Sequence, residues 1–188
     1  MPDFPRHHEP ESSKSLSKNV FIVHGRDHKP MKELKAMLSE LGLNPIVLHE
    51  QPSGSRTIVE KLEKYSDVGY AFVILTPDDV GCSVHDAVSR KEKGETRSIM
   101  GSLKARARQN VILEFGFFTG RLRRDRVCCL IKKKVERPSD MEGIVYIPFK
   151  ESVTECRDKI VKELKAVGYD IKETSGETKK WESQWKEA

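Results

Sequence analysis

The run Tyr70-Ala-Phe-Val-Ile-Leu-Thr76 is apolar along nearly its whole length, and this decides the fold class. A strand with one face in water alternates apolar and polar residues, whereas a strand inside a parallel sheet is covered on both faces. The run therefore predicts a central strand of a parallel sheet. Parallel neighbours need crossover connections, which are usually helices.

The chain on either side of this run fits alternating strands and helices. Strands are expected over residues 19–24, 45–49, 70–76, 126–131 and 145–147, and helices over 30–42, from 53–57 onward, 106–120 and 152–167. This order predicts an α/β, flavodoxin-like fold: a five-stranded parallel sheet of order 2-1-3-4-5 with helices on both faces. The basic segment 82–108 is expected to be part helix and part mobile loop.

The composition places one domain between two polar ends. Residues 1–18 are expected to be a disordered arm, 19–171 the domain, and 172–188 a polar tail or a linker to an absent domain. The net charge of +5 favours anionic partners, but the basic stretch lacks interleaved aromatic residues, so no nucleic acid is expected. No signal peptide or membrane-length apolar run is present, which predicts a cytoplasmic protein without a membrane partner.

Glu114 is the only charged residue between Arg108 and Arg121, in a helix that is otherwise mostly apolar. Burying a carboxylate costs on the order of several kcal/mol unless a partner compensates. Glu114 is therefore either structural, within an ion pair, or it faces a cleft and does chemistry.

The predicted topology brings several polar loops to one edge of the sheet. Loops 24–27, 50–54 and 77–79 each follow a strand, and the Glu114 helix begins at the same edge. Ligands of such sheets bind outside the carboxyl ends of the strands. We therefore expect a crevice at this edge with Glu114 at its floor.

Other kinds of site receive less support. Neither a GxxxxGK[ST] phosphate loop nor a GxGxxG fingerprint is present, and no CxxC pair indicates zinc or a disulfide framework. Residues 50–57 either present Arg56 and backbone N–H groups to a phosphate or form an ordinary loop that caps a helix. His24 and His28 have i, i+4 spacing, but Gly25 and Pro30 oppose a helix there. No metal site is predicted, and His24 is interpreted as a polar strand end.

Four ordered motifs give the chain a family resemblance over about residues 19–170. They are Asn19-Val-Phe-Ile-Val-His-Gly-Arg-Asp27, Glu50-Gln-Pro-Ser-Gly with Thr57-Ile-Val-Glu-Lys61, Asp67-Val-Gly-Tyr-Ala-Phe-Val-Ile-Leu-Thr-Pro-Asp-Asp79, and Ala107-Arg-Gln-Asn-Val-Ile-Leu-Glu-Phe-Gly116. Together they resemble prokaryotic TIR-like domains, in the branch of predicted nucleotide-binding proteins, some of which are fused to STING-like or cyclic-nucleotide sensors in antiphage defence. The chain departs from that pattern at Phe115, where leucine often stands, and at Arg123, near a position that is often glycine.

The resemblance implies an NAD+ glycohydrolase in which Glu114 is the catalytic residue and NAD+ is the substrate, with no cofactor. It also implies that residues 51–57 close over the nicotinamide end and that activity requires self-association into an oligomer or filament. A cyclic-nucleotide sensor domain or protein is a further implied partner. The implied substrate-binding residues are His24, Gly25, Arg26, Asp27, Ser53, Gly54, Arg56, Pro77, Asp78, Asp79 and Asn110.

Two alternatives stay open. A non-catalytic TIR module that signals only by association would make Glu114 structural. A nucleoside deoxyribosyltransferase-like enzyme would use a glutamate in a similar place to attack C1′ of a deoxynucleoside.

Overall fold

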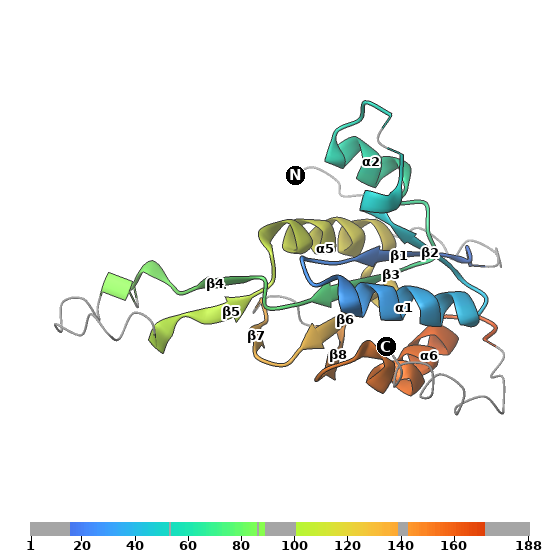
Figure 1. Cartoon of the computed structure of the whole chain (residues 1–188). Helices are drawn as coiled ribbons and strands as arrows, with labels where there is room; N and C mark the ends of the chain where they lie inside the picture. Colours follow the sequence, from blue (N-terminus) through green and yellow to red (C-terminus); the bar gives the residue numbers. More distant parts are fainter. Residues whose placement is uncertain (1–15, 53, 86, 89–100, 139–142, 172–188) are drawn as a thin grey trace, which may run out of the picture.

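The computed structural model describes residues 16–52, 54–85, 87–88, 101–138 and 143–171. Its main sheet has five strands in the order β2-β1-β3-β6-β8, and every neighbouring pair is parallel (Figure 1). The strands are β1 (Asn19–Val23), β2 (Asn44–Val47), β3 (Tyr70–Leu75), β6 (Val127–Lys132) and β8 (Val145–Phe149). The α/β fold and the predicted strand order are confirmed, and the run that decided the fold class is the central strand, buried at every residue.

Helices cover both faces of this sheet (Figure 1). Alternate side chains of a strand point to opposite faces, so Val20 and Ile22 enter one core while Phe21 and Val23 enter the other. The first core includes α1 (His28–Glu40) and α6 (Arg157–Ala166), and the second includes α2 (Ile58–Lys64) and α5 (Gln109–Leu122).

The helix ends follow local sequence signals. Asp27 caps α1 by accepting a hydrogen bond from the Lys29 N–H. Pro30 fits the first turn, because its missing N–H has no helical partner there. Thr57 and Glu60 form a reciprocal capping box at the start of α2. The predicted last helix begins instead as a 3-10 turn, η3 (Val153–Cys156), before α6.

In the segment 82–108 the prediction of a partly helical segment missed a strand, and residues 86 and 89–100 lie outside the described residues. Beside helical residues at 84–85 and 87–88, the segment contributes strand β5 (Lys104–Arg106), which lies between β4 (Asp79–Gly81) and β7 (Val135–Glu136) in a second, three-stranded sheet. Strands β4 and β5 form an arm that projects from the body of the domain (Figure 1). Three-residue strands are too short for period-two alternation to be recognised in the sequence. The predicted helix from Arg106 accordingly begins three residues later, at Gln109.

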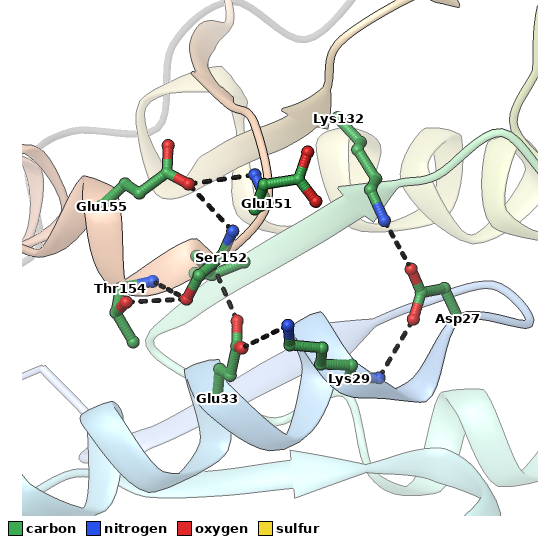
Figure 2. A network of polar contacts seen from close by, with 9 residues as sticks. Asp27, Lys29, Glu33, Lys132, Glu151, Ser152, Thr154 and Glu155 are labelled. Carbon is green, nitrogen blue, oxygen red and sulfur yellow. Dashed lines mark hydrogen bonds and ion pairs between the residues drawn. The ribbon is translucent and has the colours of Figure 1, made fainter. Parts of the chain in front are cut away.

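A polar network ties the start of α1 to the end of β6 and to the η3 turn (Figure 2). The Lys132 ammonium donates to Asp27, and the Glu33 carboxylate accepts from the Val153 N–H at 2.9 Å. Glu155 accepts from the backbone N–H groups of Glu151 and Ser152. The Asp27–Lys132 bond joins the loop after β1 to β6, and the Glu33–Val153 bond joins α1 to η3.

The predicted terminal segments lie mostly outside the described residues, which begin at Leu16 and end at Ile171. Leu16 packs against the first core, and the Ser17 carbonyl accepts a hydrogen bond from the Tyr169 hydroxyl at 2.9 Å. In the described part of the chain, no helix is both long and apolar enough to cross a membrane.

Candidate active site

The loop after β1 and the loop after β3 interlock at the carboxyl edge of the sheet. The Asp78 carboxylate accepts one hydrogen bond from the Arg26 N–H at 3.2 Å and another from the Thr76 hydroxyl at 3.0 Å. A side chain on Gly25 would collide with this carboxylate, because a β-carbon there would lie 1.6 Å from Asp78 Oδ2. Any larger residue at this crossing would have to displace the Asp78 carboxylate.

Asp27 connects the same loop to a third strand. Its carboxylate caps α1 and pairs with Lys132 at the end of β6 over 2.9 Å (Figure 2). Partial burial acts to raise the pKa of Asp27, but the hydrogen bonds from Lys132 and the Lys29 N–H outweigh it and hold the pKa below its ordinary value. Asp27 therefore carries a stable negative charge that is already compensated.

Glu114 lies in the second turn of α5, partly buried. Burial raises the pKa of its carboxyl group to about 7, and the nearby positive charge of Arg108 only partly opposes this. Among the described residues, no hydrogen bond or ion pair engages its carboxylate. Asn110 stands four residues earlier, on the same face of the helix. The alternative in which Glu114 is half of a buried ion pair therefore lacks a partner residue in the described part of the chain.

The loop between η1 (Leu48–Glu50) and α2 is held at both ends and exposed between them. The Lys61 ammonium is buried and donates to the Gln51 carbonyl at 2.8 Å, and the Thr57 cap fixes the other end. Gly54 and Ser55 both have positive φ, 53° and 58°, which turns the chain sharply. The arrangement is a tight projecting loop that presents the exposed Arg56.

Apart from His24, which is described below, the predicted site residues fall into three groups. The structure interlocks Gly25 and Arg26 with Asp78, and Asp27 in the same loop pairs with Lys132; Pro77 precedes Asp78, and Asp79 begins β4 of the arm. Glu114 and Asn110 share a face of α5, and no hydrogen bond or ion pair among described residues joins them to the loops. Gly54 and Arg56 lie in the exposed loop, while Ser53 is outside the described residues.

Three nearby residues were not predicted: Thr76, Lys132 and Arg106. Thr76 and Lys132 hold Asp78 and Asp27, and the Arg106 carbonyl accepts from the Asp78 N–H at 3.1 Å. A strand-end position next to a predicted loop was the available signal for Thr76 and Lys132. Arg106 also pairs with Glu136 and lines an open hollow of about 500 Å³ with Gln109, Ile112 and Arg137, which does not include Glu114.

A cluster of histidines stands beside the interlocked loops. The rings of His24, His28 and His49 pack against one another with centroids 4.9 to 5.6 Å apart. Burial lowers the pKa of His24 most, and the two neighbouring histidines add to this effect. His24 and His28 are not on one helix, since α1 begins only at His28; His49, on η1, was not predicted at all.

Comparison with known proteins decides the family. A family model described as the TIR domain of the CAP12/Pycsar effector protein matches residues 19–151, most of the chain. The chain belongs to this family. The resemblance found in the four motifs is thereby confirmed, and the matched range includes all three groups of candidate site residues.

Two relatives of this TIR domain add context. It is 40% identical over 147 residues to "Uncharacterized protein YuaY" of Escherichia coli (strain K12), covering 77% of this chain and 44% of YuaY. It is 32% identical over 148 residues to "Protein tirC" of Dictyostelium discoideum, covering 75% of this chain and 69% of tirC. The chain thus spans less than half the length of YuaY and about two thirds of tirC.

Proposed function

We propose that this TIR domain is an NAD+ glycohydrolase, and that Glu114 is its catalytic carboxylate. The observation that carries the proposal is the state of Glu114: partly dehydrated, with a pKa raised to about 7 by burial, and engaged by no described hydrogen-bond or ion-pair partner. Such a carboxylate is costly to fold around and is typical of a catalytic group. It belongs to a helix that starts at the edge where sheets of this type bind ligands.

One carboxylate is enough for this reaction. Glycosidases need a second carboxylic acid because their leaving oxygen must be protonated. In NAD+ the bond from ribose C1′ to nitrogen breaks with its electron pair moving onto a cationic ring, so nicotinamide leaves neutral. Water then adds to C1′ and releases a proton, giving ADP-ribose; attack by the substrate's own adenine or hydroxyl group would give a cyclic product.

Glu114 supplies charge stabilisation in this scheme. Its carboxylate hydrogen-bonds the ribose hydroxyls and stabilises the oxocarbenium-like transition state, an effect that is larger where water is partly excluded. Asn110, on the same helix face, would orient the same ribose in this proposal. Arg26 and Arg56, both exposed near the carboxyl edge, offer positive charge to the pyrophosphate.

The family to which the chain belongs suggests its biological setting. We infer an antiphage effector that acts in the cytoplasm, is activated by self-association and responds to a cyclic-nucleotide sensor. Support for self-association comes from apolar side chains left in water: Val80 on β4 is 69% exposed, Val84 79% and Leu113 on α5 68%.

The decisive test measures nicotinamide release from NAD+ across a series of protein concentrations. The wild type is expected to turn over NAD+, with specific activity rising as protein concentration rises, and Glu114→Gln is expected to lose at least a hundredfold in kcat. Glu40→Gln is the matched control, since it makes the same chemical change at an exposed site on the last turn of α1. Equal turnover by Glu114→Gln and wild type would remove Glu114 from the mechanism. Deoxynucleosides offered in place of NAD+ test the deoxyribosyltransferase-like alternative.

The pH dependence gives a second, independent reading. If the ionised form of Glu114 is the active one, kcat/KM should rise with pH and level off above about 7, because kcat/KM reports the free enzyme. Bound NAD+ brings a cationic ring to the carboxylate and should lower its pKa. The acid limb of kcat is therefore expected at lower pH than that of kcat/KM.

The exposed apolar side chains also favour a second candidate, a TIR module that signals only by association. That function predicts that neither the wild type nor Glu114→Gln releases nicotinamide from NAD+, even at protein concentrations at which the domain self-associates. It also predicts that Glu114→Gln alters stability without altering partner capture.

A further inference from the structure

We propose that His24, His28 and His49 form a binding site for Zn²⁺. Each histidine offers one ring nitrogen, and these nitrogens all lie within 4.8 Å of one another. The three residues come from three elements: His24 follows β1, His28 opens α1, and His49 is the middle residue of η1. This site rests on these contacts alone and does not depend on the proposed NAD+ chemistry.

The spacing of the nitrogens is close to what zinc needs. Ligand nitrogens about 2.0 to 2.1 Å from a tetrahedral zinc ion stand about 3.3 Å from each other. His24 Nε2 and His49 Nδ1 are 3.0 Å apart and share one hydrogen bond, so a zinc ion would take the place of the proton between them. The His28 nitrogen lies within 4.8 Å of the other two, and its ring is exposed, so zinc binding would draw this ring inward.

The protonation of His24 is arranged as in zinc-binding histidines. Its Nδ1 lies 2.8 Å from the Gly25 carbonyl oxygen, which can only accept, so Nδ1 carries the proton and Nε2 presents a lone pair. Metal-binding histidines usually donate their second ring nitrogen to a carbonyl or carboxylate in this way. The Arg26 N–H belongs to the same peptide unit as this carbonyl and donates to Asp78, so the carbonyl is held in place.

The donor set selects the class of metal. Three neutral imidazoles suit Zn²⁺, with Cu²⁺ and Ni²⁺ as competitors, and do not suit Mg²⁺ or Ca²⁺, which take oxygen ligands. The nearby carboxylates already have partners: Asp27 pairs with Lys132, Glu50 with Lys35, and Asp78 accepts from Arg26 and Thr76. Three ligands leave a fourth position of the tetrahedron for water or another molecule.

Zinc at this site would join η1 to β1 and α1. Gln51 follows η1 directly and begins the exposed loop that runs to Thr57. The bound ion would therefore fix the base of that loop. Its expected second signature is slower hydrogen exchange of the backbone N–H groups in residues 50–57 when zinc is present.

The experiment is a calorimetric titration of the chelator-treated full chain with Zn²⁺, without NAD+. The expected result is one ion per chain for the wild type, with affinity at least tenfold weaker in His28→Ala and in His49→Ala. Two controls should bind as the wild type does: His85→Ala, and a double variant His7→Ala with His8→Ala, which removes the adjacent histidines of the N-terminal sequence. Co²⁺ in place of Zn²⁺ should give visible bands of a nitrogen and oxygen site without the near-ultraviolet band of a thiolate ligand.

Two outcomes would overturn the proposal. One is wild-type affinity in both His28→Ala and His49→Ala, with unchanged melting temperatures showing that the variants are folded. The other is loss of binding only in the His7/His8 double variant. Failure of NAD+ turnover is a separate result, because the titration contains no nucleotide.

Discussion

Glu114 makes the folding of this domain depend on pH. A carboxyl group with a raised pKa holds its proton more tightly in the folded than in the unfolded chain. For Glu114 the ordinary value is 4.5 and the folded value is about 7. The stability that the protonated Glu114 carboxyl group contributes is therefore fully present below about pH 4.5 and is lost as the pH rises through 7.

Replacing Glu114 by glutamine should remove this loss. Between pH 5 and pH 8, the free energy of unfolding of the wild type is expected to fall by about 2 kcal/mol more than that of Glu114→Gln, since glutamine carries no charge to bury. Urea unfolding at both pH values measures the difference. Glu40→Gln serves again as the control and should keep the wild-type slope. A Glu114→Gln variant that loses stability with pH as steeply as the wild type would contradict the assigned burial.

Arg123 stores backbone strain at the end of α5. Its φ of 70° and ψ of 163° lie in a region that is almost restricted to glycine and costs of order 1–3 kcal/mol for other residues. The ion pair that its side chain makes with Asp125, at 3.7 Å, is solvent-exposed and contributes at most a few tenths of a kcal/mol. The position is near one where TIR-like chains often carry glycine.

Arg123→Gly is accordingly expected to raise the free energy of unfolding by about 1 kcal/mol, after the entropy of the extra glycine is subtracted. Arg123→Ala removes the same side chain but keeps the β-carbon, so it should give no gain. Thermal unfolding of both variants separates the two effects. Equal stabilisation by alanine would attribute the gain to charge and not to backbone conformation.

At the scale of elements, the loops after β1 and β3 behave as one unit. Gly25 and the Asp78 carboxylate occupy adjoining space, and Asp78 also holds the Arg26 N–H. A methyl group at residue 25 must displace that carboxylate. The two positions should therefore be energetically coupled.

A double-mutant cycle tests this coupling. Gly25→Ala alone should destabilise the fold by about 1–3 kcal/mol through overpacking. Asp78→Ala alone loses the two hydrogen bonds of the carboxylate, but it also removes the carboxylate atoms that a β-carbon at residue 25 would contact. The double variant is expected to be at least about 1 kcal/mol more stable than the sum of the single changes predicts. Simple additivity, measured by urea unfolding, would show that the loops do not interlock.

The five-strand order was predictable because each long strand carries a continuous apolar run flanked by helix signals. The second sheet was not, since β4, β5 and β7 are two or three residues long and are joined by pairings distant in sequence, as between Ala105 and Val135. At the site, loops that follow strands were predicted from topology. His49 was missed because only the folded chain brings η1 next to His24, and the lack of a described ion pair at Glu114 was equally invisible in sequence.

At the scale of the whole molecule, the arm presents Val80, one of the most exposed apolar side chains of the described residues, to a neighbouring copy. Val80→Glu places a charge on β4 where the valine is 69% exposed. Its free energy of unfolding should change by less than about 0.5 kcal/mol, because nothing buried is altered. The rise of specific activity with protein concentration should be weakened at least fivefold.

Lys162→Gln is the matched control for Val80→Glu. It lowers the net charge by the same amount at an exposed position on α6, outside the arm. Sedimentation velocity at the same concentrations checks that activity and assembly change together. A Val80→Glu variant that assembles and acts as the wild type does would place self-association elsewhere.

The connection between the arm and α5 gives the domain a mechanical link. Only Ala107 and Arg108 separate the last residue of β5 from the first residue of the helix that carries Glu114. Lys104 and Arg106 both pair with Glu136, so two ion pairs join β5 to β7 across the small sheet. A partner bound to β4 or β5 would therefore contact a segment that continues, after two residues, into the helix that carries Glu114.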